Sequence, residues 1–173
     1  RKKESSDFWS FLHKAVLAKE AKIETSIDPF FLLRVMEHQF NHGITQQEST
    51  IQVLKEVVLL EPKPPQRAFL LKRIAQEQYR QGMQELAFES IDKAFQVVNS
   101  IPNHDPVTKR DLLSELIQFH LSNKNLDKAY SLAKHISGSN LKLDTYMDIA
   151  NAYLTSGELE EAQKIHRDAL RYV

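Results

Sequence analysis

Residues 149–169 read IANAYLTSGELEEAQKIHRDA, and this stretch decides the fold class. Apolar and small side chains recur every three or four positions on both sides of Gly157, which is the spacing of helices with one buried face. A glycine just past a helix end takes the left-handed conformation without a side-chain clash. The stretch therefore predicts two antiparallel helices joined by a turn at Gly157.

The same pattern occurs twice earlier in the chain. One copy repeats the offsets with Ala75, Gly82, Ala87 and Ala94 in place of Ala150, Gly157, Ala162 and Ala169. A middle copy around Ala129 keeps the small residue but lacks the glycine. Its alanine lies 42 residues after Ala87 and 33 before Ala162, so we expect an extra turn and loop within 99–108. Small residues at these positions allow two helix backbones to pack closely.

Helical periodicity extends over the whole chain, and no segment shows the alternation of a strand. Glycines and Asp-Pro pairs are expected at helix ends: Gly43, Gly82, Gly138 and Gly157 after helices, Asp28-Pro29 and Asp105-Pro106 at their starts. Thr45 to Glu48 fits a capping box, and Asn125 is a further expected cap. Nine helices are predicted, at 6–23, 28–42, 46–60, 65–81, 83–99, 106–122, 125–136, 141–155 and 158–172.

The segment Glu61-Pro62-Lys63-Pro64-Pro65 is the clearest interruption, because its prolines cannot continue a helix. It divides an N-terminal helical segment, residues 1–62, from a repeat region, residues 66–173. We favour one continuous domain in which the first segment packs onto the repeat array. A separate N-terminal piece is the alternative.

These residues resemble the tetratricopeptide repeat, a helix-turn-helix unit of about 34 residues. The likeness is good over 143–173, fair over 68–98 and degenerate over 110–137, and every copy lacks the tryptophan and final proline of the family pattern. A related helical-hairpin solenoid with a variable repeat length is the alternative. Either resemblance implies an all-α, antiparallel helix-hairpin array, an α-solenoid with a right-handed superhelical turn. Its concave face would be lined by the first helix of each pair.

The resemblance also implies where a partner binds. The groove positions of the family correspond here to Phe69, Lys72, Gln76, Tyr79, Arg80, Asp111, Ser114, Gln118, Leu121, Ser122, Asp144, Met147, Asn151, Leu154 and Thr155. From these we predict the partner-binding residues Lys72, Gln76, Tyr79, Arg80, Ser114, Gln118, Met147 and Asn151. The paired lysines and asparagines with which one subgroup of the family clamps a terminal carboxylate are incomplete. The polar, uncharged centre of this face suits hydrogen bonding to an extended or helical peptide.

Composition limits the remaining functions. The 23 basic and 23 acidic side chains cancel, which disfavours nucleic acid as a partner because its binding requires clustered positive charge. There is no cysteine, so disulfide and thiol chemistry are excluded. The longest wholly apolar run is residues 57–60, far too short to cross a membrane. A cytoplasmic location is predicted.

No motif indicates catalysis, a cofactor or a metal. His38 and His42 share a helix face at a spacing that can hold a metal, but no third ligand accompanies them, and packing or solvation explains the pair better. His120 and His166 are expected to pack between helices, and His135 to lie in the last turn of a helix, where positive charge is favourable. We therefore predict a non-enzymatic protein that binds a protein or peptide.

Other functions stay open as alternatives. Phe8, Phe11, Leu12, Ala15 and Val16 form an apolar stripe that indicates either packing onto the next helices or self-association. A structural role through homo-oligomerisation, or a regulatory role inside a longer protein, is thus the second hypothesis. The third is RNA binding through a local basic patch that comprises Lys63, Arg67, Lys72, Arg73 and Arg80.

Overall fold

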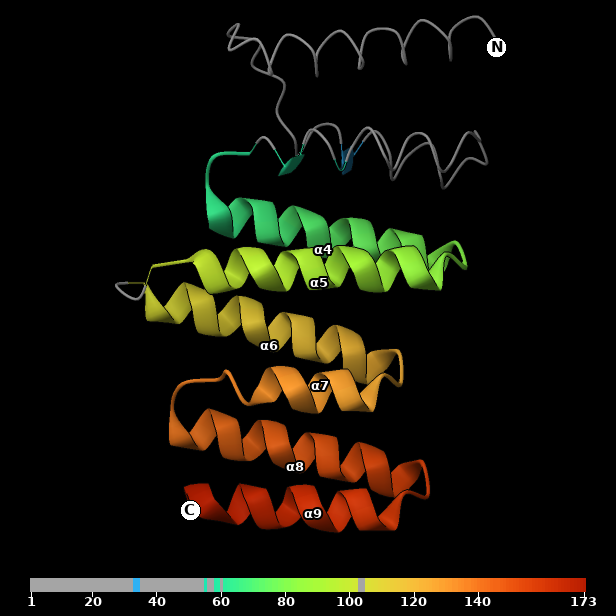
Figure 1. Ribbon diagram of the computed structural model, residues 1–173, viewed down its shortest axis with the longest axis vertical. Helices are drawn as coiled ribbons and strands as arrows, with labels where there is room; N and C mark the ends of the chain where they lie inside the picture. Colours follow the sequence, from blue (N-terminus) through green and yellow to red (C-terminus); the bar gives the residue numbers. More distant parts are fainter. Residues whose placement is uncertain (1–32, 35–54, 56–57, 60, 103–104) are drawn as a thin grey trace, which may run out of the picture. The chain divides into compact units, whose positions relative to one another are not determined.

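The computed structural model describes residues 33–34, 55, 58–59, 61–102 and 105–173 (Figure 1). These residues form helices, turns and loops, and this part of the chain contains no β-strand. The chain divides into two compact units, Arg1–Val97 and Val98–Val173. Several predictions lie outside the described residues: the helix at 6–23, most of the helices at 28–42 and 46–60, the Thr45 capping box and the end at Gly43.

In the first unit, a helical hairpin is formed by α4 (Pro64–Arg80) and the main part of α5 (Gln84–Ser100). Proline in the first turn of α4 needs no intrahelical partner for its missing N–H. The Arg67 Nε donates a hydrogen bond of 2.8 Å to the Glu61 carbonyl, which holds the connector against the start of α4. Small and branched apolar side chains of both helices are buried: Ala68, Leu70, Leu71, Ile74, Ala75, Ala87, Ile91 and Ala94.

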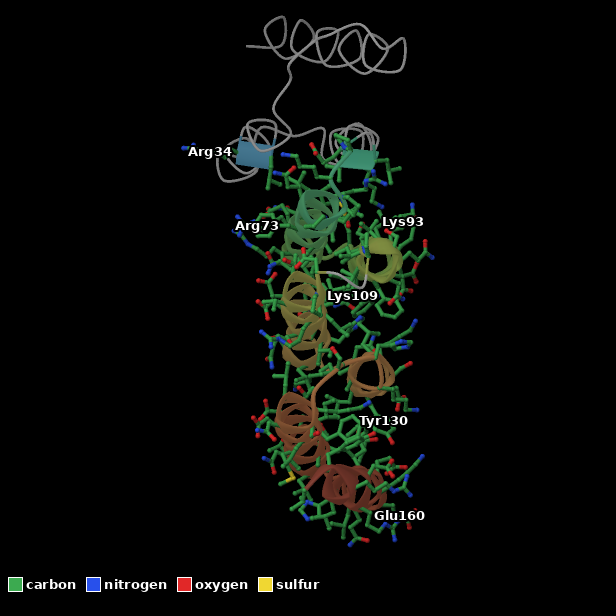
Figure 2. The ribbon with its side chains drawn as sticks, turned by 90° about the vertical axis from the view of Figure 1, so that its left-hand side faces the viewer. Arg34, Arg73, Lys93, Lys109, Tyr130 and Glu160 are labelled. Atoms are coloured by element: carbon green, nitrogen blue, oxygen red, sulfur yellow. The ribbon has the colours of Figure 1, made fainter. Side chains whose placement is uncertain are left out.

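The second unit consists of two further hairpins. The first is α6 (Pro106–Ser122) with α7 (Leu126–Ala133), and the second is α8 (Ser139–Thr155) with α9 (Leu159–Ala169). A 3-10 helix, Leu170–Tyr172, follows α9 and packs on α8. Because α7 also contacts α8, the hairpins are in direct succession. Figure 2 shows α6 and α8 in one layer and α7 and α9 in the other.

One turn geometry joins the two helices of all three hairpins. After α4 the Gly82 N–H donates to the Tyr79 carbonyl (3.0 Å) and the Met83 N–H to the Gln78 carbonyl (2.9 Å). This pair of bonds is the Schellman motif, which requires a left-handed residue at its centre. Gly82 supplies that residue with φ +80°. The predicted glycine turn is confirmed here.

The other two turns repeat the motif. After α8 the bonds run from the Gly157 N–H to Leu154 (3.0 Å) and from the Glu158 N–H to Tyr153 (3.0 Å). After α6 they run from the Lys124 N–H to Leu121 (3.1 Å) and from the Asn125 N–H to His120 (2.9 Å). In this middle copy Lys124 takes the left-handed position itself, with φ +57°. The missing glycine therefore changes the residue and leaves the turn intact.

The register of the repeat is also constant. The first helices α4, α6 and α8 each contain 17 residues. Each begins 23 residues before the alanine of the second helix (64 to 87, 106 to 129 and 139 to 162). Ala87, Ala129 and Ala162 are all buried, as the sequence predicts.

The residues that lengthen the step from Ala87 to Ala129 lie earlier in the chain than the predicted position, 99–108. The connections between hairpins, 101–105 and 134–138, are equally long, but α5 continues to residue 100, whereas α7 ends at residue 133. The prediction of an added loop within 99–108 is therefore wrong. The second helix itself is longer, because the apolar series Ile91, Ala94 and Val98 keeps it buried.

Three local predictions about helix ends need correction, whereas the Asp105 cap is confirmed by its 3.3 Å hydrogen bond from the Thr108 N–H. Asn125 occupies the cap position of α7, but its side chain makes no capping hydrogen bond. His135 lies beyond α7 because the helix ends at Ala133. Gly138 precedes α8 with φ +96° instead of closing α7, so it serves the turn into the next helix.

Candidate functional site

The predicted partner-binding residues of the second unit lie on α6 and α8, the two first helices of its hairpins. Gln118 and Asn151 are exposed, and Ser114 and Met147 are half-buried. The Ser114 hydroxyl donates a 3.0 Å hydrogen bond to the Arg110 carbonyl of its own helix. Within this set, Gln118 and Asn151 therefore have the most accessible polar groups.

The predicted residues of the first unit lie along α4. Gln76 and Arg80 are exposed, whereas Lys72 and Tyr79 are half-buried. Lys72 Nζ lies 4.9 Å from the centre of the Phe69 ring, which is within the range of a cation–π contact. The rings of Tyr79 and Phe88 pack edge to face at 6.0 Å. Arg80 pairs with the buried Glu77 carboxylate at 2.9 Å.

These contacts bear on the basic patch. Arg67, Lys72 and Arg80 each interact with a group of their own unit: the Glu61 carbonyl, the Phe69 ring and the Glu77 carboxylate. Of these three partners the Glu77 carboxylate alone carries a negative charge, so its ion pair with Arg80 lowers the local positive potential that an RNA phosphate would encounter. The predicted partner-binding residues therefore lie on different helices in the two units. One set is on α4 in the first unit, and the other is on α6 and α8 in the second unit.

Buried polar side chains occupy one register position in all three first helices: Gln78, His120 and Tyr153. The Gln78 Oε1 accepts a 2.7 Å hydrogen bond from the Ser90 hydroxyl of α5. The Tyr153 hydroxyl donates a 2.6 Å hydrogen bond to the Asp127 Oδ1 of α7, in the preceding hairpin. The His120 ring packs edge to face on Phe119 at 5.9 Å. The expected burial of His120 is confirmed.

A tyrosine cluster joins α7, α8 and the 3-10 helix. The Tyr146 ring lies 5.6 Å from Tyr130 and 5.7 Å from Tyr172, and the Tyr130 hydroxyl donates to the Asp168 carboxylate of α9. Burial, followed by the nearby Tyr172, raises the pKa of Tyr146 to about 12. The pKa of Tyr130 is also raised, first by burial and then by its bond to Asp168.

The structure also reveals a surface that sequence reasoning missed. A hollow of about 340 Å³ lies between α8 and α9, lined by Ala150, Asn151, Leu154, Ala162, Gln163, His166 and Arg167. The predicted core position of His166 is wrong, because its side chain is exposed on α9 beside this hollow. The signal was present in the sequence: this position holds alanine in the middle copy, at Ala133, and the polar histidine replaces it only in the last copy.

Neither a metal site nor a membrane span is found in the described part of the chain. Its His, Asp and Glu side chains form no group of three or more that could hold a metal ion. His38 and His42 lie outside these residues. None of the helices searched in this part has both the length and the apolar composition needed to cross a bilayer. Comparisons with family models, curated proteins and solved structures gave no significant match.

Proposed function

We propose that this chain is a non-catalytic protein-interaction domain whose hairpins stack into a right-handed solenoid of the tetratricopeptide type. The recurrence of one turn and one register, centred on Gly82, Lys124 and Gly157, carries the proposal. A hairpin of this kind cannot bury its apolar surface alone and is stabilised by neighbouring copies. The contact of α7 with α8 is one such neighbour interaction.

The proposed mechanism is presentation of a preformed surface by the first helices of the hairpins. Exposed amides on α6 and α8, Gln118 and Asn151, supply hydrogen-bond donors and acceptors to a protein or peptide segment. Both are carried on helices whose buried faces hold them in place, so little ordering entropy is lost on binding. Met147, half-buried on α8, adds an adaptable apolar contact.

The test uses two arginine substitutions on opposite layers of the second unit. Gln118→Arg places a bulky charge on the proposed face, whereas Ser131→Arg places it on the exposed side of α7 as a matched control. Circular dichroism first establishes that both variants fold. Proteins captured by the tagged wild-type chain from cell extract are then identified and quantified by mass spectrometry.

We expect Gln118→Arg to reduce capture of the specific partner at least about tenfold, since one misplaced charge at an interface costs more than about 1.4 kcal/mol. Ser131→Arg should capture the partner as the wild type does. Equal capture by all three proteins would remove the α6 and α8 face from the binding site.

A further inference from the structure

The exposed sides of α6 and α8 carry the same chemistry at the same register positions. A shift of 33 residues relates the two helices, as it relates Ala129 to Ala162. It matches two acidic positions, one amide position and one hydroxyl position: Asp111 with Asp144, Glu115 with Asp148, Gln118 with Asn151, and Ser122 with Thr155. Each of these side chains is exposed, so packing does not dictate its type.

Matching positions lie at matching levels of the two helices, because α6 and α8 run in the same direction and lie in one layer (Figures 1 and 2). The face is therefore acidic toward the helix starts, with amides in the middle and hydroxyls toward the ends. We call the carboxylates of Asp111, Glu115, Asp144 and Asp148 the acidic rows. Glu115 and Asp148 are not among the groove positions that the resemblance implies.

The acidic rows do not stabilise the helices that carry them. Neither α6 nor α8 has an acidic residue in its first turn, where the helix dipole favours negative charge. On each helix the two carboxylates are four residues apart and therefore neighbours on the helix surface. Like charges at this spacing destabilise a helix. A cation from outside the two helices would relieve this repulsion.

The carboxylates of α8 are not compensated by the chain itself. Lys142 is the single basic residue of α8. Its Nζ donates a 2.8 Å hydrogen bond to the Lys134 carbonyl and lies 5.0 Å from the centre of the Tyr172 ring. Within the described part of the chain, no ion pair or hydrogen bond involves the carboxylate of Asp144 or Asp148.

The cations of α6 compensate its carboxylates only in part. Lys109 Nζ donates a 3.4 Å hydrogen bond to the Asn99 carbonyl. Arg110 pairs with Asp111 at 2.9 Å, and both side chains stay accessible to solvent. An exposed ion pair of this kind contributes little to stability, so a partner can replace it at small cost.

The amide position recurs in the first hairpin, whereas the acidic positions do not. A shift of 42 residues places Gln118 on the exposed Gln76 of α4, and it places Asp111 and Glu115 on Phe69 and Arg73. An amide side chain both donates and accepts hydrogen bonds, so it can bond to the backbone of any peptide. The amides thus suit binding that is independent of sequence, and the acidic rows add a preference for charge in the second unit.

We propose that the face of α6 and α8 binds a segment of a partner protein that is rich in lysine and arginine. This inference rests on the function proposed above and specifies the partner of that same face. Gln118 and Asn151 bond to the backbone of the segment, and its basic side chains pair with the acidic rows. Complementary charge accelerates the encounter and excludes acidic segments.

The test uses two labelled synthetic peptides of about 10 residues, which exceed the width of two helices when extended. Their uncharged positions are identical, and every second residue is lysine in one peptide and glutamate in the other. Binding to the whole chain is measured by fluorescence anisotropy at low ionic strength. We expect the lysine peptide to bind at least about tenfold more tightly, and its affinity to fall as salt rises.

Two double variants with an equal change of charge show where the peptide binds. Asp144→Asn with Asp148→Asn removes the carboxylates of α8 from the face. Glu160→Gln with Glu161→Gln removes two exposed carboxylates from α9 and is the matched control. We expect the first double variant to weaken binding of the lysine peptide at least about threefold, whereas the control should bind it as the wild type does.

The melting temperature separates a binding role from a structural one. Asparagine has about the helix propensity of aspartate, and the two asparagines of the α8 double variant no longer repel each other. This variant should therefore melt at the temperature of the wild type or above it. A lower melting temperature would show that the carboxylates stabilise the fold, and it would overturn the proposal.

Equal binding of the two peptides, or equal weakening by the two double variants, also overturns the proposal. Gln118→Arg separates it from the proposed function. If that variant loses the captured partner while the α8 double variant retains it, the face binds a protein that is not selected by basic charge, so the function stands and this inference fails. Retention of the partner by Gln118→Arg removes the function itself. A chain that lacks Arg1-Lys2-Lys3 and binds the lysine peptide more tightly than the full chain would place its own basic start on the face instead.

Discussion

Lys124 shows at the scale of one residue how the fold tolerates a departure from its own pattern. Two of the three hairpin turns place glycine in the left-handed position, and the third places Lys124 there with φ +57°. A side chain in this conformation meets the following carbonyl group and costs about 1 kcal/mol or more. The turn persists because the same two backbone hydrogen bonds close it and the helices on both sides are buried.

Replacing this lysine should therefore stabilise the chain. Lys124→Gly removes the left-handed strain, and the larger entropy of glycine in the unfolded chain offsets part of the gain. We expect a net increase of up to about 1 kcal/mol in the free energy of unfolding, measured by urea denaturation. Lys164→Gly, in the middle of α9, is the control and should destabilise by about 1 kcal/mol. A Lys124→Gly variant that is less stable than the wild type would contradict this account of the turn.

At the scale of elements, most helices could be predicted because their signals are local. Gly82 and Gly157 mark turns, Asp105-Pro106 marks the start of α6, and the predicted bounds of α4, α5, α6 and α8 agree with the structure within two residues. The early end of α7 at Ala133 could not be predicted, since the apolar period continues to Ile136, which is buried outside the helix.

The exposed hollow between α8 and α9 was missed for a related reason. The sequence identifies which side of a helix is apolar, but a neighbour decides whether that side is covered. Leu126 and Leu159 are the same residue in the same register, and only the first has a helix lying over it. The polar residues Gln163 and His166 become informative once Tyr130 is seen half-buried and Ala133 fully buried at the equivalent positions.

The tyrosines that connect α7, α8 and the 3-10 helix should make stability depend on pH. In the unfolded chain a tyrosine has a pKa of about 10, whereas burial raises the pKa of Tyr146 to about 12 in the folded protein. The folded state thus favours the neutral ring. The contribution of the neutral Tyr146 side chain to the free energy of unfolding is complete below about pH 10. This contribution is lost as pH rises through about 12.

Urea unfolding at about pH 8 and about pH 11 provides the measurement. The free energy of unfolding should fall between these values, and Tyr146→Phe should reduce the fall because one titrating hydroxyl is removed. The comparison with the phenylalanine variant isolates the tyrosine from lysines that titrate in the same range. An identical fall in both proteins would show that the Tyr146 hydroxyl does not contribute to the pH dependence.

At the scale of the whole molecule, the repeat array that we propose is stabilised by contacts between neighbouring hairpins rather than by one central core. The last hairpin shows the consequence, since α8 covers Leu126, Tyr130 and Ala133 of α7 and its Tyr153 hydroxyl bonds to Asp127. Removing this hairpin should not leave the remaining helices unchanged. It should convert a buried helix surface into an exposed apolar one.

A chain shortened to end at Ser137 tests this expectation. Losing the burial of two large side chains at about 1.5–3 kcal/mol each should lower the free energy of unfolding by at least about 3 kcal/mol. The shortened chain should also bind a hydrophobic dye and associate in light scattering, because the α7 surface is uncovered. Replacing Leu126 and Tyr130 by glutamine in the shortened chain should suppress the association without restoring stability. A shortened chain that stays monomeric with the melting temperature of the full chain would mean that α6 and α7 do not depend on their neighbour.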